Sequence, residues 1–246
     1  MDRNNAWREA MHRKSQAGFS LIEMLIACAI TMVIMGVIFG QIIQGQKYSV
    51  AQEAKLDLFQ ESRQFMDQMS RDLRAAGYPN TRNFDADPNS PAQDSPKEAV
   101  GLVKLDVGEL QFESSIDGSE NVSVIHYKLV TTGAACPCLV RSQTPKIVGD
   151  PLTDQGSPVY QTEVQNVLNG SSSDPIFQAY YSSTGHAADL PIDITNLAMA
   201  DINSVAITLK VQSPYLDPQT RQKPTMTLIS TVRLNNCSVA YPTTTG

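Results

Sequence analysis

The sequence predicts an α+β protein, in which one long N-terminal helix precedes an antiparallel β-sheet domain. Helical periodicity runs from an apolar segment at residues 19–43 into an amphipathic segment at 44–77. After a polar linker at 78–99, residues 100–246 contain short segments with the alternation and β-branched residues typical of strands. These observations divide the chain into a helical part and a β-rich globular domain.

Residues 19–43 have the length and composition of a membrane-spanning helix. Glu23 is the one charged residue between Phe19 and Phe39, and about 20 apolar residues suffice to cross a bilayer. A carboxylate in such a helix costs roughly 2.5–3.5 kcal/mol, so Glu23 is a candidate functional residue. The alternative is a simple signal anchor that carries a stray glutamate.

Residues 1–18 form a charged leader in front of the apolar segment. The leader carries four basic and two acidic residues, and this positive excess predicts that it stays in the cytoplasm. A secretory signal has its cleavage site after the apolar segment, whereas the small residues Ala17 and Gly18 lie before it. Cleavage here leaves a protein that begins with its own membrane helix.

Two glycines, Gly36 and Gly40, form a G-x-x-x-G pattern within the apolar segment. Such a pattern is typical of a face that packs closely against another transmembrane helix. The alternative is a local weakening of the helix, because glycine costs roughly 1 kcal/mol relative to alanine.

The amphipathic segment has apolar residues that recur mostly three and four positions apart, which predicts one buried face. They are Ala51, Ala54, Leu58, Phe65, Met69, Leu73 and Ala76. Gly77, followed by Tyr78 and Pro79, predicts the end of the helix, because glycine caps it and proline does not continue it.

The segments predicted to be strands are joined by short connections, which favour antiparallel pairing. They are residues 100–103, 109–113, 122–130, 139–142, 201–211 and 226–234. We expect 122–130 and 139–142 to form one hairpin. We expect 201–211 and 226–234 to form another around a polar, proline-containing loop at 212–224.

The chain has four cysteines. Cys28 lies in the apolar segment and is expected to serve as a small apolar residue. In an oxidising periplasm, the other three are candidates for disulfides. We favour a long-range bridge from Cys136 or Cys138 to Cys237, with a local Cys136–Cys138 ring as the alternative.

No metal or cofactor site is predicted. The histidines, His12, His126 and His186, lack zinc-ligand spacing. Asp85-x-Asp87-x-Asn89 begins like a calcium loop, but the glycine and glutamate of an EF-hand are missing, which favours a solvated loop.

Enzymatic activity and nucleic-acid binding are not predicted either. The chain has no hydrolase, metalloprotease or phosphate-binding motif. Its formal net charge is −6 and it contains no run of basic residues, so the electrostatic signature of nucleic-acid binding is missing.

The order of residues around Gly18 resembles the class III leader of type IV prepilins and pseudopilins, which is a glycine, an aromatic residue, a few apolar residues and a glutamate. The resemblance implies a pilin-like fold and cleavage by a prepilin peptidase between Gly18 and Phe19. It implies that the same enzyme methylates the new N-terminus at Phe19. It also implies that Glu23 pairs with the N-terminal amine of a neighbouring subunit in the filament.

At the end of the predicted helix, residues 70–78 (SRDLRAAGY) resemble PilW-like minor pilins and the related J-type minor pseudopilins of type II secretion. The resemblance implies a minor pilin that primes or caps a pilus. Its partners would be other minor and major pilins, the inner-membrane assembly platform and, before assembly, the lipid bilayer. The globular domain would be periplasmic and later reach the cell surface.

Two other roles are consistent with the sequence. One is a minor pseudopilin of a type II secretion system. The other is a tip adhesin that binds a surface or ligand through the β-domain, with contacts in a loop expected at residues 171–191, where Tyr180 and Tyr181 lie.

Overall fold

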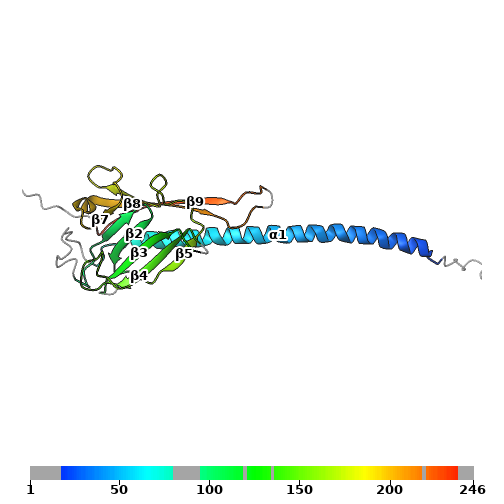
Figure 1. Cartoon of the computed structure of the whole chain (residues 1–246), viewed down its shortest axis with the longest axis horizontal. Coiled ribbons are helices and arrows are strands. Elements are labelled where there is room, and N and C mark those ends of the chain that lie inside the picture. Colours follow the sequence, from blue (N-terminus) through cyan, green and yellow to red (C-terminus); the bar gives the residue numbers. More distant parts are fainter. Residues whose placement is uncertain (1–17, 80–94, 119–120, 134–135, 218–219, 238–246) are drawn as a thin grey trace, which may run out of the picture. The chain divides into compact units, whose positions relative to one another are not determined.

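The computed structural model of the chain describes residues 18–79, 95–118, 121–133, 136–217 and 220–237. These residues form a long helix, two antiparallel sheets and a short 3-10 helix, which confirms the predicted α+β class (Figure 1). The chain divides into two compact units, with the boundary between Val50 and Ala51. The leader up to residue 17 and the loop predicted at 85–89 lie outside the described residues.

Helix α1 spans Leu21–Arg74. In the first unit, every side chain that it carries up to Val50 is exposed. In the second unit, one face of the helix is buried, and this face contains most of the predicted apolar residues. The buried residues are Leu58, Ser62, Phe65, Met66, Met69, Ser70, Asp72 and Leu73. Ala51 and Ala54 are only half-buried and the first buried residue is Leu58, so the predicted face begins about two turns too early.

The end of α1 is fixed by a glycine turn, as predicted. Gly77 has a φ of +83°, and a Cβ at this position would lie 2.7 Å from the Asn236 carbonyl oxygen. The Gly77 amide donates to the Glu113 carbonyl at 2.9 Å. The turn therefore requires glycine both for its backbone conformation and for the space beside it.

The first sheet has six strands in the order β5-β4-β3-β2-β1-β7. They are β1 Leu102–Asp106, β2 Glu109–Ser114, β3 Ser123–Val130, β4 Cys138–Pro145, β5 Gln161–Gln165 and β7 Ile192–Asp193. The predicted hairpin is confirmed as β3 and β4, with Tyr127 opposite Arg141. The segments β5 and β7 were not predicted, since each is short and pairs with a strand distant in sequence.

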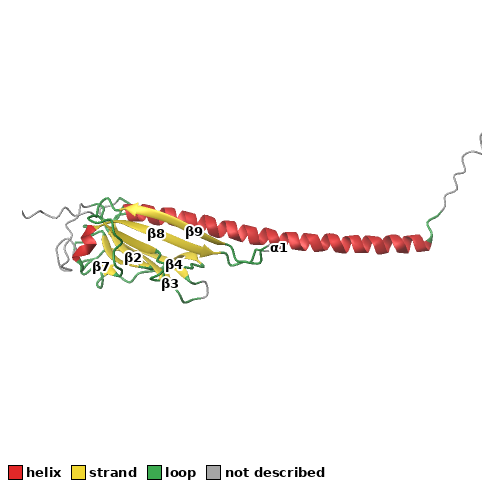
Figure 2. Ribbon diagram, turned by 90° about the horizontal axis from the view of Figure 1, so that it is seen from above, coloured by secondary structure: helices red, strands yellow, loops and turns green. Residues whose placement is uncertain are grey.

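The second sheet has three strands in the order β6-β8-β9 (Figure 2). They are β6 Phe177–Tyr181, β8 Ile202–Gln212 and β9 Thr225–Arg233, and the 3-10 helix Leu197–Asp201 precedes β8. The predicted hairpin of β8 and β9 is confirmed. The loop expected at 171–191 is wrong in part, because Phe177 and Ala179 are buried and β6 pairs along β8.

The cysteines pair locally. Cys136 and Cys138 form a disulfide, and the favoured bridge to Cys237 is wrong. Cys138 lies opposite Val130 at the end of β3, whereas the Cys237 thiol donates to the Ala76 carbonyl at 3.4 Å, at the end of α1. That helix end meets β2 near Glu113, which lies opposite Val124. The two sites are about 20 Å apart along β3, and a disulfide does not span that distance.

A buried polar contact fastens α1 to the first sheet. The Tyr127 hydroxyl donates to the Asp72 carboxylate at 2.7 Å, and the Arg141 guanidinium donates to the same oxygen at 3.0 and 3.1 Å. Around this contact, the Tyr127 ring packs against Phe65 and Phe112, with centroids 5.7 and 6.3 Å apart. Burial raises the pKa of Tyr127, and the Asp72 charge raises it further, so the phenol stays protonated and acts as a donor.

Replacing Asp72 by alanine is expected to destabilise the second unit by about 2–4 kcal/mol, because it removes the acceptor of a buried hydroxyl and of a partly buried guanidinium. Denaturant unfolding of the full chain in detergent measures this loss. The exposed Asp67, one helical turn earlier, provides the control, and Asp67→Ala is expected to change stability by about 0.5 kcal/mol or less. Equal effects of the two substitutions would contradict the assignment.

Candidate functional site

The first candidate site is the junction between the leader and α1. Gly18, Phe19 and Ser20 are exposed and precede the helix. The helix begins where the Ser20 carbonyl accepts bonds from the amides of Glu23 and Met24, at 3.0 and 3.1 Å. The Gly18–Phe19 peptide bond therefore lies outside the helix, where its backbone is accessible to a peptidase.

Glu23 lies in the first turn of α1. A carboxylate here is favoured by the unpaired amides at the positive end of the helix. Among the described residues, no side chain forms a hydrogen bond or an ion pair with it. The structure therefore places Glu23 four residues after Phe19 on an exposed helix end, without a partner from the described part of its own chain.

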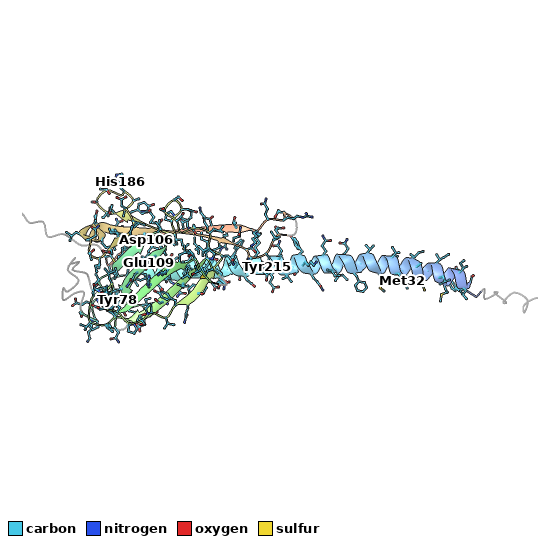
Figure 3. The ribbon with its side chains drawn as sticks, in the orientation of Figure 1. Met32, Tyr78, Asp106, Glu109, His186 and Tyr215 are labelled. Carbon is cyan, nitrogen blue, oxygen red and sulfur yellow. A yellow bond between two sulfur atoms is a disulfide. The ribbon has the colours of Figure 1, made fainter. Side chains whose placement is uncertain are left out.

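The apolar half of α1 has no cover within the described chain. Large apolar residues are exposed on all sides of the helix, and Met32, which projects from it in Figure 3, is 75% exposed. This is one helix that is long and apolar enough to cross a membrane. Its Thr31 hydroxyl donates to the carbonyls of Ala27 and Cys28, both at 2.9 Å. The helix thus satisfies this polar group internally, as an apolar environment requires.

Gly36 and Gly40 have open space beside them. A Cβ at either position would meet no atom within 4 Å, apart from the neighbouring backbone of the helix itself. Packing within the described chain therefore gives no reason for glycine at these positions.

A second candidate site is a cleft of about 470 Å³ on the outer face of the first sheet. Its floor contains side chains of β1 to β4, including Glu109 (Figure 3). Residues 151–160 of the following loop form its wall. Sequence analysis missed this site. Alternation along β2 and β3 places Glu109, Gln111 and His126 on one face, but only the register brings them beside Lys104 and Tyr160.

Four side chains of the cleft are joined in one hydrogen-bonded network. His126 Nε2 lies 2.8 Å from Glu109 Oε1, and the Tyr160 hydroxyl lies 2.8 Å from His126 Nδ1. Lys104 Nζ donates to the second Glu109 oxygen at 2.8 Å. Both imidazole nitrogens and both carboxylate oxygens are thus engaged. The network ties the loop that contains Tyr160 to the sheet.

Glu109 is the most strongly perturbed acid of this network. The hydrogen bond from His126 lowers its pKa from 4.5 to about 2, and Lys104 adds to this effect, while partial burial opposes it. A carboxylate that is held ionised in this way stabilises the fold above its ordinary pKa. This stability is lost as the pH falls from about 4.5 to about 2.

The Glu109→Gln variant is expected to lose less stability than the wild type on acidification from pH 4.5 to 2, with a difference of at most about 3 kcal/mol. Thermal unfolding across this pH range measures the difference. Glu98→Gln, at an exposed glutamate, is the control and should follow the wild type. Parallel curves for Glu109→Gln and the wild type would show that the network does not hold the carboxylate ionised.

Metal binding finds no geometric support in the described part of the chain. No three residues of the histidine, cysteine, aspartate or glutamate type are grouped there as metal ligands.

Comparison with known proteins supports the first candidate site. A family model described as "prokaryotic N-terminal methylation motif" matches residues 13–39, which span the leader junction and most of the apolar segment. Neither a search of curated proteins nor a search of solved structures gives a match. The motif implies processing by a prepilin peptidase and assembly with other pilins, and the apolar helix fits membrane anchoring. The matched motif and the α+β architecture together support a type IV pilin-like protein.

Proposed function

We propose that this protein is a minor type IV pilin that primes or caps a pilus. The observation that carries the proposal is the methylation motif at residues 13–39, which runs into a helix whose apolar surface has no cover within the described chain. Proteins with this motif are structural subunits and not enzymes. Residues 1–18 are the cleaved leader, 19–43 the membrane and filament-core segment, and 44–77 the amphipathic helix, which is buried on one face from Leu58 onward.

Maturation explains the arrangement at the helix start. Cleavage after Gly18 exposes the amine of Phe19, which the peptidase then methylates. An ammonium and a carboxylate are each costly in an apolar environment, and pairing recovers much of that cost. Glu23 has no side-chain partner among the described residues, so it is available to the amine of a neighbouring subunit.

The segment that resembles PilW-like proteins has a structural role here. Of residues 70–78, Asp72 accepts the bonds from the first sheet, and Gly77 forms the turn that ends the helix. Leu73 and Ala76 are fully buried. These residues thus join the helix to the domain. Gly36 and Gly40 are proposed to pack against another helix, since a Cβ at either position would meet no atom within 4 Å in the described chain.

In cells, the matured subunit is anchored in the inner membrane with its domain in the periplasm, and it then enters the filament. A pseudopilin of type II secretion shares the same leader and the same processing. Deleting the gene distinguishes the two roles. Loss of surface pili with normal exoprotein release supports the role of a pilin. Normal pili with blocked exoprotein release would instead support the role of a pseudopilin.

Replacing Gly18 by valine is expected to leave the unprocessed precursor, because the peptidase requires a small residue before the cut. A Cβ at this position would meet no atom within 4 Å, so the change does not disturb the packing of the described chain. The size and N-terminal sequence of the protein from membrane fractions measure maturation. Normal maturation of Gly18→Val would overturn the cleavage assignment.

Replacing Glu23 by valine is expected to spare cleavage and to reduce incorporation into filaments by on the order of tenfold, since the amine of the neighbouring subunit loses its partner. Immunoblots of sheared pili, normalised to the processed protein in membranes, give the ratio. Glu23→Asp keeps the carboxylate and should retain more incorporation than Glu23→Val. Assembly of Glu23→Val at the wild-type level would refute the pairing role.

A further inference from the structure

The sheet edges of the second unit are protected unequally. Natural edge strands are protected by shortness, charges, bulges or covering segments, because unpaired backbone groups invite another strand. Strand β7 has two residues. Strand β5 has five residues, contains Glu163 and pairs with β4 through an irregular register. The free side of β6 is covered, since Ala188 N donates to the Ala179 carbonyl at 2.9 Å.

Strand β9 is the exception. It has nine residues, contains no proline and pairs with β8 in an unbroken register. Two hydrogen bonds at the ends of the strand show which of its residues bond to β8. Leu234 N donates to the Asn203 carbonyl at 2.7 Å, and Ser213 N donates to the Pro224 carbonyl at 2.8 Å. Along an antiparallel pair, residues alternate between hydrogen-bonded and non-hydrogen-bonded positions, so the even-numbered residues of β9 bond to β8. The odd-numbered residues, from Thr225 to Arg233, direct their amides and carbonyls outward.

These outward groups are unpaired in the part of the chain that the structure describes, where no other segment hydrogen-bonds to them. The side chains of the odd-numbered residues are exposed as well. They are Thr225, Thr227, Ile229, Thr231 and Arg233, and Ile229 is 72% exposed. Threonine and isoleucine favour strands. The only charge on β9 lies at its end, so its centre lacks the usual protection.

The other face of β9 is held in place by the helix. Met226 and Leu228 pack against the core, and the Ser230 and Ser70 hydroxyls are 3.1 Å apart. Beside the strand lies a hollow of about 280 Å³ between α1 and β9, lined by Met66, Leu228, Ile229 and their neighbours. Strand β9 is thus packed on one face while its edge is open, and the hollow has room for a side chain from an added strand.

We propose that the free edge of β9 receives an extended strand from a different pilin-like subunit, which continues the second sheet by β-strand addition. This inference rests on the proposed function, because the partner is a co-assembling subunit. The row of exposed side chains begins with Lys223 and ends with Arg233, with threonines and Ile229 between them. The partner strand therefore carries carboxylates toward its ends and β-branched or hydroxyl side chains at its centre.

A second copy of this chain does not fit the edge. A second β9 strand has the same cation near each end. Pairing it in parallel and in register places Lys223 beside Lys223 and Arg233 beside Arg233, and antiparallel pairing brings Lys223 near Arg233. Such like-charge neighbours are destabilising. A strand from a different subunit, with carboxylates toward its ends, avoids this repulsion.

The test is site-specific photo-crosslinking in cells that assemble the filament, with the full chain. A photo-reactive amino acid at Thr231 on β9 is expected to give an adduct with another pilin-like subunit, identified by mass spectrometry. The same amino acid at Thr162, an exposed residue of β5, is the matched control and should give no such adduct.

Two further changes test the backbone contact. Ile229→Pro removes an amide that points outward, and it leaves the bonds between β9 and β8 intact. Ile229→Lys places a charge at the centre of the edge. Each is expected to lower the Thr231 adduct by on the order of tenfold, while Ile229→Thr, which keeps the amide and the branching, should retain it. Thermal unfolding of the variants in detergent shows that the fold persists.

The results that overturn this inference are distinct from those that overturn the proposed function. No adduct at Thr231, an adduct with a second copy of this chain, or an adduct unaffected by both Ile229→Pro and Ile229→Lys would refute the β9 contact, even when the subunit is processed and assembled. Normal maturation of Gly18→Val would instead refute the proposed function.

Discussion

The contact between Asp72 and the first sheet is the interaction on which the second unit depends. A carboxylate on a buried helix face is costly unless its oxygens are bonded, and here Tyr127 and Arg141 donate to it from neighbouring strands. The contact fixes the rotation of the helix, so that Phe65 and Met69 enter the core. It also fixes the position at which Gly77 turns the chain toward the β-domain.

The two halves of α1 differ in what covers their apolar side chains. From Leu58 onward, the helix buries an apolar face against its own sheets. Before Val50, its apolar side chains find no cover within the described chain, which fits anchoring in a membrane. The same reasoning applies to β9, whose outward backbone groups have no partner among the described residues. In both places, the described chain leaves apolar side chains or backbone groups without a partner.

Much of this organisation could be predicted from the sequence because it depends on local signals. The apolar run, the three-and-four spacing from Leu58 to Ala76 and the Gly77 stop identify α1, and alternation identifies the long strands of both hairpins. The short strand β6 was not predictable in the same way. Its five residues become a strand only through pairing with β8, which lies more than twenty residues later. The bridge favoured for Cys237 was wrong for a related reason. The positions of cysteines along the chain do not show which of them lie close together in the folded sheet.

The sequence by itself identified the methylation motif, the apolar helix and the class of the fold, because each depends on residue types at fixed spacing along the chain. Only the tertiary structure decided the rest. The Glu109 network and the Asp72 contact join residues that are distant in sequence, and the strand order of the second sheet leaves β9 at an edge. Their existence depends on strand register and helix rotation, which are set by the packing of the whole domain and not by any local pattern.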